Sequence, residues 1–222
     1  MALATLRRAR DVSADIGWQG VLRIGPRWLV CRRYLAIVAE LRDLAPERAR
    51  PREIRVTALD DAAVPAVSAL DSAMTADEVA RRLREGQRCT LGWWGCELAH
   101  YRWDCTGAVH LPYLGRALKP GQDDQVVVGI YTGPAFRGRG IAGAVMMDVI
   151  RRARGVGVGR LVWLAAWWNT RSLALTEQVA SRVVGTVGYW VVGPCRRYFA
   201  AGEVRIGADG AVRIDVVSGG AR

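Results

Sequence analysis

The residues with the clearest chemical meaning in this chain are two arginines and two glycines in alternation, Arg137, Gly138, Arg139 and Gly140. They follow an apolar stretch, residues 125–132, with the composition of a buried strand, and a helix is expected to begin directly after them. The first amides of a helix have no partner within it, and the helix dipole is positive at that end. Glycine lets the backbone approach a ligand closely, and arginine adds full positive charge. The segment therefore predicts an anion site that suits a pyrophosphate.

Other phosphate-binding turns fit this segment less well. The P-loop pattern GxxxxGK[ST] is absent. Gly138, Gly140 and Gly143 match the dinucleotide pattern GxGxxG, but the sequence around them does not fit that motif. Gly138 lies six positions after Thr132, so the turn is not tight, and no acidic residue ends the next strand. Taken alone, the segment could also be a surface turn with solvated arginines.

The surrounding sequence alternates between strand and helix patterns. Strand-like alternation over 53–59 is followed by helix patterns that end near residues 70 and 85, of which the second begins with a Thr75–Glu78 capping box. The later elements are expected at 89–94 and 96–104 as a hairpin, at 125–132, 160–166, 184–192 and 198–206 as strands, and at 140–154 and 170–181 as helices. Residues 107–124 are rich in turn formers, and residues 28–41 fit a strand or a short helix equally well.

This order predicts an α/β fold of the α+β type with a central mixed β-sheet. The strand–helix–strand–helix run from 125 to 181 implies parallel neighbours, and the hairpin before it adds antiparallel strands. We expect six to seven strands flanked by about four helices. Residues 1–50 are interpreted as an N-terminal extension and residues 51–222 as one domain.

The glycine-rich segment also resembles the signature of a known family. Residues 137–142 are similar to the (Gln/Arg)-x-x-Gly-x-(Gly/Ala) motif of the GCN5-related N-acetyltransferase (GNAT) family, and residues 169–172 resemble its later Asn-x-x-(Ala/Ser) motif. The resemblance covers roughly residues 52–206. It implies a GNAT-like fold, acetyl-CoA as cosubstrate and no metal.

The resemblance implies a role for each matching position. The backbone amides of Arg137, Gly138, Arg139, Gly140, Ile141 and Ala142 would hold the coenzyme A pyrophosphate. The backbone of Ile130, Tyr131 and Thr132 would pair with the pantetheine arm, in a slot between two strands that the family splays apart. Asn169, with Ser172 in the same motif, would bind the pantetheine or cap the helix that follows it, and the two roles are compatible.

Catalytic residues are harder to assign than binding residues. His100 and Asp124 are candidates for the base that deprotonates the amine, although a strand histidine is often structural and a turn aspartate is often solvated. Many family members carry a tyrosine acid at the position of Thr176 here, so water, Tyr189 or no group at all would protonate the leaving thiolate. Trp167 and Trp168, just before Asn169, are candidate walls of the acceptor pocket.

Composition narrows the function classes. The five cysteines, Cys31, Cys89, Cys96, Cys105 and Cys195, form no CxxC pair, and only two histidines accompany them, so neither a zinc site nor a disulfide framework is supported. The net charge of +11 with a single lysine fits either an anion-attracting surface or an arginine-rich coding bias. No apolar run of transmembrane length and no secretory signal are recognised, so we expect a cytoplasmic protein.

The sequence therefore predicts an acetyl-CoA-dependent N-acyltransferase that moves an acetyl group to a primary amine by direct attack in a ternary complex. A small-molecule acceptor is expected rather than a protein, with no membrane or nucleic-acid partner, and the extension could form a homodimer contact. The alternative is a catalytically degenerate GNAT domain that binds acyl-CoA as a sensor or scaffold. A nucleic-acid-associated module is a third candidate, although the arginines are scattered over the whole chain.

Overall fold

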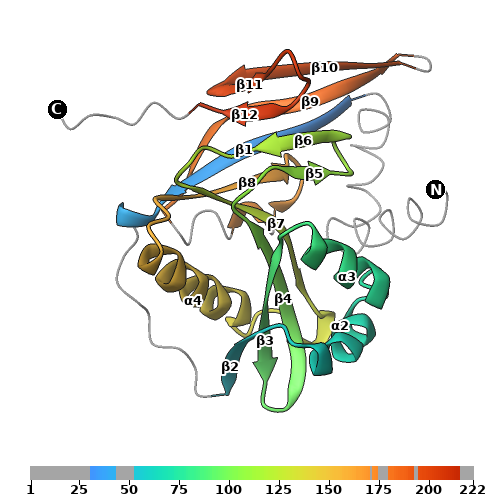
Figure 1. Ribbon diagram of the computed structural model, residues 1–222, viewed down its shortest axis with the longest axis vertical. Helices are drawn as coiled ribbons and strands as arrows, with labels where there is room; N and C mark the ends of the chain where they lie inside the picture. The colour runs from blue at the N-terminus through green and yellow to red at the C-terminus, as the bar shows by residue number, and fades with distance from the viewer. Residues whose placement is uncertain (1–30, 44–52, 171, 175–179, 193–194, 216–222) are drawn as a thin grey trace.

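The protein is organised around one large mixed sheet. The computed structural model describes residues 31–43, 53–170, 172–174, 180–192 and 195–215. Eight strands form the sheet in the order β10-β9-β1-β8-β7-β4-β3-β2. Four further strands form a second sheet in the order β11-β12-β6-β5, which lies beside the upper half of the large one (Figure 1). The strands are β1 (Cys31–Glu40), β2 (Ile54–Ala58), β3 (Arg88–Trp94), β4 (Glu97–Cys105), β5 (Val109–Leu111), β6 (Arg116–Lys119), β7 (Asp124–Thr132), β8 (Arg160–Ala166), β9 (Arg182–Val192), β10 (Cys195–Gly202), β11 (Val204–Ile206) and β12 (Val212–Ile214).

Helices cover both faces of the lower half of the sheet. The α-helices with both ends in the described residues are α2 (Val64–Leu70), α3 (Ala76–Arg84) and α4 (Ile141–Gly155), with short 3-10 helices η1 (Leu41–Asp43), η2 (Asp61–Ala63) and η3 (Pro134–Phe136). Helix α4 lies on one face, and α2 with α3 lies on the other (Figure 1). Met146 and Ile150 of α4 pack on Ile37, Leu161 and Trp163. Residues of α2 and α3 pack on Leu91, Tyr101 and Trp103. No helix within the described residues is long and apolar enough to cross a membrane.

Local signals set several element ends as the sequence predicts. Asp60 accepts a hydrogen bond from the amide of Ala63, and Thr75 accepts one from the amide of Glu78 at the start of α3. Gly95, with φ of 59°, turns the β3–β4 hairpin. The expected strand at 198–206 is broken in two, because Gly202 adopts a φ of 75° between β10 and β11.

The N-terminal part of the chain differs from the expected extension. The segment 28–41, left open between strand and helix, contributes β1 (residues 28–30 lie outside the described part), and β1 lies inside the large sheet. It pairs antiparallel with β8 on one side and with β9 on the other. Ala36, Ile37 and Ala39 are fully buried there. The expected boundary at residue 50 therefore does not separate β1 from the domain core.

The second sheet is the other difference from expectation. Residues 107–124, interpreted as turns, contain β5 and β6, which join β11 and β12 from the end of the chain. This small sheet packs on the face opposite α4, where Leu111, Leu114 and Leu118 contact residues of β1, β8 and β9. Strands of three or four residues give no period long enough to recognise in the sequence. The large sheet also has eight strands rather than six to seven.

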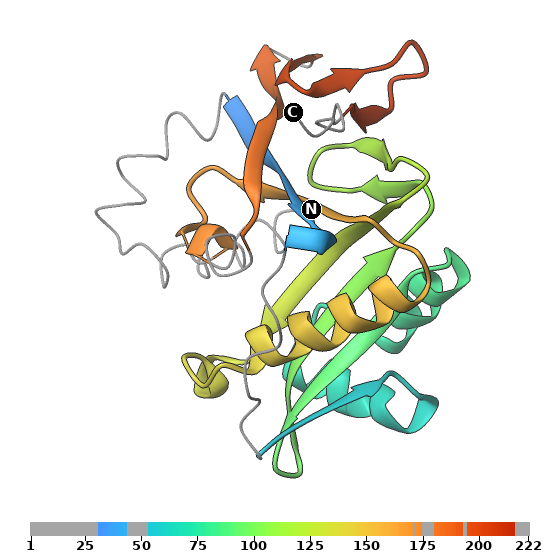
Figure 2. The same cartoon turned by 90° about the vertical axis from the view of Figure 1, so that its left-hand side faces the viewer.

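Among the described strands, β7 and β8 form the one parallel pair of the large sheet, and they are joined through α4. Their ladder has three residue pairs, which end at Val126 and Val162. Strand β7 continues to Thr132 and β8 to Ala166, so the two strands diverge beyond that point. Figure 2 shows them separating toward the end at which α4 begins. No strand in the described part of the chain pairs with this edge of β7 beyond Val126.

Candidate active site

The turn between β7 and α4 has the geometry of an anion site. After Thr132 the chain passes through η3 and enters α4 at Ile141. Gly138 and Gly140 adopt φ values of 78° and 75°, in the left-handed region that disfavours other residues. Gly140 is the N-cap of α4, and no side chain caps the helix there. The two glycines are therefore required by the backbone path.

The amides of this turn are available to a ligand. Within the described residues, the backbone N–H groups of residues 138–143 donate no recorded backbone hydrogen bond, and the first helical bond is from Ala144 to Gly140. A Cβ placed on Gly138, Gly140 or Gly143 would meet no atom within 4 Å, so the space in front of them is open. Successive free amides at a helix N-terminus attract phosphate groups. The sequence-based prediction of an anion site is consistent with this arrangement.

The two arginines of the turn act differently from each other. Arg137 donates from Nε to the carbonyl of Thr132 at 3.2 Å, which ties the turn to the end of β7. Arg139 lies over the ring of Trp94 at 5.0 Å and close to that of Phe136 at 5.9 Å. Trp94 belongs to the β3–β4 hairpin, so Arg139 clamps the turn to a neighbouring hairpin through cation–π contact. The sequence offered no signal for this role of Trp94.

The residues expected along the coenzyme arm flank the divergence. Ile130, Tyr131 and Thr132 form the end of β7, beyond its last pairing with β8. Ile130 is 38% exposed and Trp167, just after β8, is 36% exposed, which is high for apolar side chains of this size. An apolar arm that added itself as a strand here would cover both groups.

Asn169 acts as a helix cap at the end of β8. Its Oδ1 accepts a hydrogen bond from the amide of Ser172 at 3.1 Å, and its carbonyl accepts one from Leu173. The structure thus contains the helix cap that was expected of Asn169. The other expected role, binding of the pantetheine arm, stays a prediction, and Asn169 lies beside the divergence of β7 and β8, where that role would be needed. Thr176 lies outside the described residues.

His100 lies beneath the first turn of α4 and is almost completely buried, at 1% exposure. Its Nδ1 is 2.8 Å from the hydroxyl of Thr132, and its Nε2 is buried with no partner within the described residues. Burial, with a smaller contribution from the positive charge of Arg102, lowers the pKa of His100 to about 3. A buried neutral imidazole of this kind fixes the end of β7, and it is poorly suited to take a proton near neutral pH.

The buried imidazole makes a testable prediction about acid stability. Between pH 6.5 and 3 the unfolded chain binds a proton at His100 and the folded chain does not, so stability falls as the pH falls. In the His100→Gln variant the free energy of unfolding should fall less steeply with falling pH, by about 1.4 kcal/mol per pH unit in this window. The measurement is urea denaturation from pH 4 to 7, with His110→Gln at an exposed position as the matched control. Parallel stability curves for wild type and His100→Gln would contradict the assignment.

Asp124 is a structural residue in this fold. It lies at the start of β7, at the opposite end from the anion turn, and is 2% exposed. One carboxylate oxygen accepts from Arg160 at 2.6 Å, and the other accepts from the amide of Gly121 at 2.7 Å. The pair joins β7 to β8 where their ladder begins. The proposal of Asp124 as the base therefore does not fit its surroundings.

Tyr189 is also placed away from the turn. It is buried between β9 and the small sheet, and its hydroxyl donates to the carbonyl of Tyr113 at 3.4 Å. Tyr34 donates to the same carbonyl at 3.3 Å, and Tyr198 donates to the carbonyl of Leu114 at 3.0 Å. The three hydroxyls hold the β5–β6 turn against the large sheet. His100, Asp124 and Tyr189 are thus not brought together.

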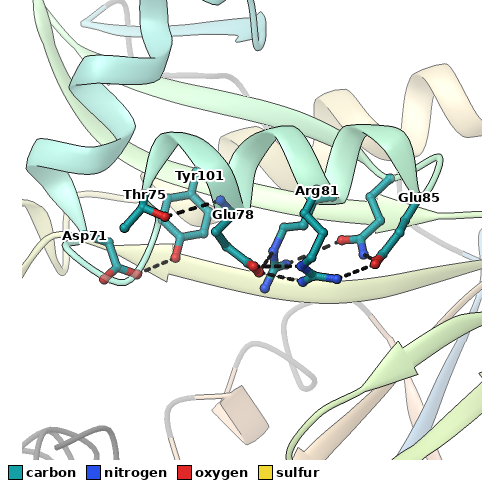
Figure 3. A network of polar contacts seen from close by, with 8 residues as sticks. Asp71, Thr75, Glu78, Arg81, Glu85 and Tyr101 are labelled. Carbon is teal, nitrogen blue, oxygen red and sulfur yellow. Dashed lines mark hydrogen bonds and ion pairs between the residues drawn. The ribbon is translucent and has the colours of Figure 1, made fainter.

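A polar network on α3 is the feature that the sequence did not single out. Glu78 accepts from both Arg81 and Arg82, and Arg81 also binds Glu85 (Figure 3). These contacts lower the pKa of Glu78, mainly through the hydrogen bond from Arg81. Arg82 is the member that faces β7, since its Nη1 lies 3.7 Å from the point that a Cβ on Gly129 would occupy. Helical spacing places Glu78 and Arg82 together, but only the packing of α3 on the sheet places Arg82 beside Gly129.

Comparison with known proteins agrees with the fold and the turn. Residues 104–181 match the model of the acetyltransferase (GNAT) family. A Novosphingobium aromaticivorans protein described as an acetyltransferase of the GNAT family superposes with a TM-score of 0.52 at 20% identity, over 71% of this chain and 62% of that one. A Staphylococcus epidermidis protein of unknown function gives a TM-score of 0.50 at 12% identity, over 75% of this chain and 64% of that one. The chain thus spans less than two thirds of each of these proteins, and no curated protein matches it.

These features define a mixed α/β fold like that of the acetyltransferases it superposes on, with a glycine-rich turn of free amides beside two diverging strands. The segment 104–181, which contains the turn, matches the acetyltransferase (GNAT) family.

Proposed function

We propose that the protein transfers the acetyl group of acetyl-CoA to a primary amine by direct attack in a ternary complex. The observation that carries the proposal is the run of free amides from 138 to 143, placed where β7 parts from β8. A pyrophosphate bound at this run would lead its pantetheine arm along the unpaired edge at Ile130, Tyr131 and Thr132. The thioester would then lie near the point of divergence.

The transfer needs one bond exchange and one proton. The amine nitrogen attacks the thioester carbonyl carbon, a C–N bond forms, the C–S bond breaks, and coenzyme A leaves as a thiolate. The proton lost by the amine passes to solvent, and the thiolate gains a proton from solvent. A backbone amide of β7 beside the thioester would stabilise the developing oxyanion.

Positioning is proposed as the main source of rate acceleration. His100 stays neutral and buried beneath α4, Asp124 is held by Arg160, and Tyr189 is held by the β5–β6 turn. Holding the amine and the thioester in contact can by itself supply a large part of the barrier reduction. We propose the cytoplasm as the compartment and a small molecule as the acceptor.

The proposal is tested by thiol release from acetyl-CoA with a panel of primary amines. Because the neutral amine attacks, kcat/KM should rise with pH up to the pKa of each amine and then level off. The inflection should therefore move when one acceptor is replaced by another with a different amine pKa. An inflection that stays at one pH for every acceptor would indicate a titrating enzyme base and refute this part of the mechanism.

The same assay separates catalysis from binding alone. A degenerate domain would bind coenzyme A in calorimetry and release no thiol with any amine. Absence of coenzyme A binding would overturn the proposal as a whole.

A further inference from the structure

The face of the sheet opposite α4 has two covers that meet over β7. Helices α2 and α3 cover β3 and β4, and the small sheet covers β1, β8 and β9. Val128 of β7 packs against both cores, so the boundary between the covers passes over this residue. The pairing of β7 with β8 ends two residues earlier, at Val126. The boundary therefore lies over the point where the proposed thioester would sit.

Arg82 forms the α3 side of this boundary. Its guanidinium lies over the ring of Trp103 at 5.4 Å, and its Nη1 lies 3.7 Å from the Cβ position of Gly129. The side chain is 16% exposed, so the charge is largely sheltered from water. Gly129 follows Val128 directly, so Arg82 stands beside the divergence of the two strands.

A closed ring of polar contacts holds the guanidinium in place. Nε of Arg82 donates to Glu78 at 2.7 Å, and Nη1 lies 3.5 Å from Oε1 of Gln87. Gln87 donates from Nε2 to Glu85 at 3.2 Å, and Arg81 connects Glu85 back to Glu78. Figure 3 shows the Glu78, Arg81 and Glu85 side of this ring. An arginine fixed in this way loses little side-chain entropy when it binds a ligand.

One hydrogen-bond donor at this boundary remains for a ligand. Nη2 of Arg82 has no recorded partner within the described residues and is not among the buried unpaired atoms. The indole Nε1 of Trp103, in the ring over which the guanidinium lies, also has no partner within the described part of the chain, but this atom is fully buried and out of a ligand's reach. A sheltered guanidinium with a free N–H favours an anionic ligand at this place.

Two stacked tyrosine rings lie near this donor. The ring of Tyr131, on β7, stacks on Tyr101 at 5.7 Å between centroids. The hydroxyl of Tyr101 donates to Asp71 at 2.6 Å (Figure 3). Asp71 is the C-cap of α2, so this hydrogen bond holds the Tyr101 ring in place. The stacked rings and the guanidinium give this boundary one apolar side and one positive side.

We infer that Arg82 determines acceptor specificity by binding a carboxylate on the amine substrate. The acceptor class is a small amino-carboxylate, in which the amine reaches the thioester while the carboxylate lies against Arg82. This inference rests on the proposed acetyl transfer and names the substrate class for that same site.

The test compares acceptors that differ only in the carboxylate. Thiol release is measured with 4-aminobutanoate against 4-aminobutanamide and with glycine against glycinamide, each referred to the concentration of neutral amine. A charge-assisted hydrogen bond contributes about 1.5–3 kcal/mol, so kcat/KM should favour the carboxylate by roughly 10- to 150-fold in at least one pair. Arg82→Gln should remove this preference mainly through KM and leave acetyl-CoA affinity unchanged.

Arg84→Gln is the matched control. Arg84 lies on the same helix as Arg82, is exposed and takes no part in the ring of contacts that holds the Arg82 guanidinium. The control should keep the preference for the carboxylate. A preference that survives in Arg82→Gln would overturn the inference.

The outcomes distinguish this inference from the proposed function. The wild-type comparison needs no variant, so it is decisive even if Arg82→Gln fails to fold. Turnover of amides and carboxylates at equal rates would overturn the role of Arg82 and leave acetyl transfer standing. Acetyl-CoA binding without turnover of any acceptor would overturn both.

Discussion

Gly143→Glu is expected to weaken coenzyme A binding on the order of 100-fold without destabilising the fold. Gly143 is the third residue of α4, and a Cβ there would meet no atom within 4 Å. A unit negative charge about 6 Å from a phosphate costs roughly 3 kcal/mol at an effective dielectric constant of 20, which corresponds to about 100-fold in affinity. Isothermal titration calorimetry with coenzyme A measures the loss.

This substitution is informative because it should lower coenzyme A affinity without lowering the stability of the fold. Replacing glycine inside a helix removes a cost of about 0.5–1 kcal/mol, and a carboxylate in the first turn interacts favourably with the helix dipole. Gly143→Glu should therefore melt at the same temperature as the wild type or higher. Gly143→Gln is the matched control, because it adds the same bulk without the charge.

Salt provides a second check on this prediction. The affinity gap between the Glu and Gln variants should narrow as ionic strength rises, because the repulsion is screened. Equal affinities of the two variants at low salt would show that no phosphate binds at the start of α4, and the proposed site would then be abandoned.

Asp104→Ala should be among the most destabilising single substitutions in the protein, at about 3–5 kcal/mol. Asp104 and Arg102 lie on β4, and their side chains are 7% and 1% exposed. Three hydrogen bonds of 2.8–2.9 Å connect the carboxylate and the guanidinium. Removing the carboxylate leaves a buried cation without its partner, which costs far more than the pair itself contributes.

Two further variants distinguish the loss of one charge from the loss of the whole Arg102–Asp104 ion pair. Replacing both residues, with Arg102→Met and Asp104→Leu, should restore most of the stability, because no charge is then left buried. Asp209→Ala removes an exposed carboxylate paired with Lys119 and Arg213, and it should change stability little. Urea denaturation reports all three. A double variant no more stable than Asp104→Ala would argue that the pair fixes the packing of β4.

Particular residues show how far local sequence could predict this protein. Gly138, Gly140 and the free amides around them form a feature confined to a few consecutive residues, so its geometry follows from backbone preferences alone. The β3–β4 hairpin and the caps at Asp60 and Thr75 are confirmed for the same reason.

The surroundings of the catalytic candidates depend on distant partners, which the sequence does not reveal. His100 is a polar residue in an ordinary strand pattern, and its burial depends on α4, which begins only at Ile141. Asp124 resembles a turn residue until Arg160 is brought beside it. Residue type indicates which groups can titrate, whereas the pKa depends on burial and on neighbouring charges.

The glycine-rich turn, the alternation of strands and helices around it, and most helix starts could be predicted from the sequence, because each depends on contacts within a few residues. The position of β1 between β8 and β9, the second sheet, and the approach of Arg82 to Gly129 became evident only in the folded structure. These features join segments that are far apart in the chain, and which segments meet is decided by the packing of whole faces rather than by any local pattern.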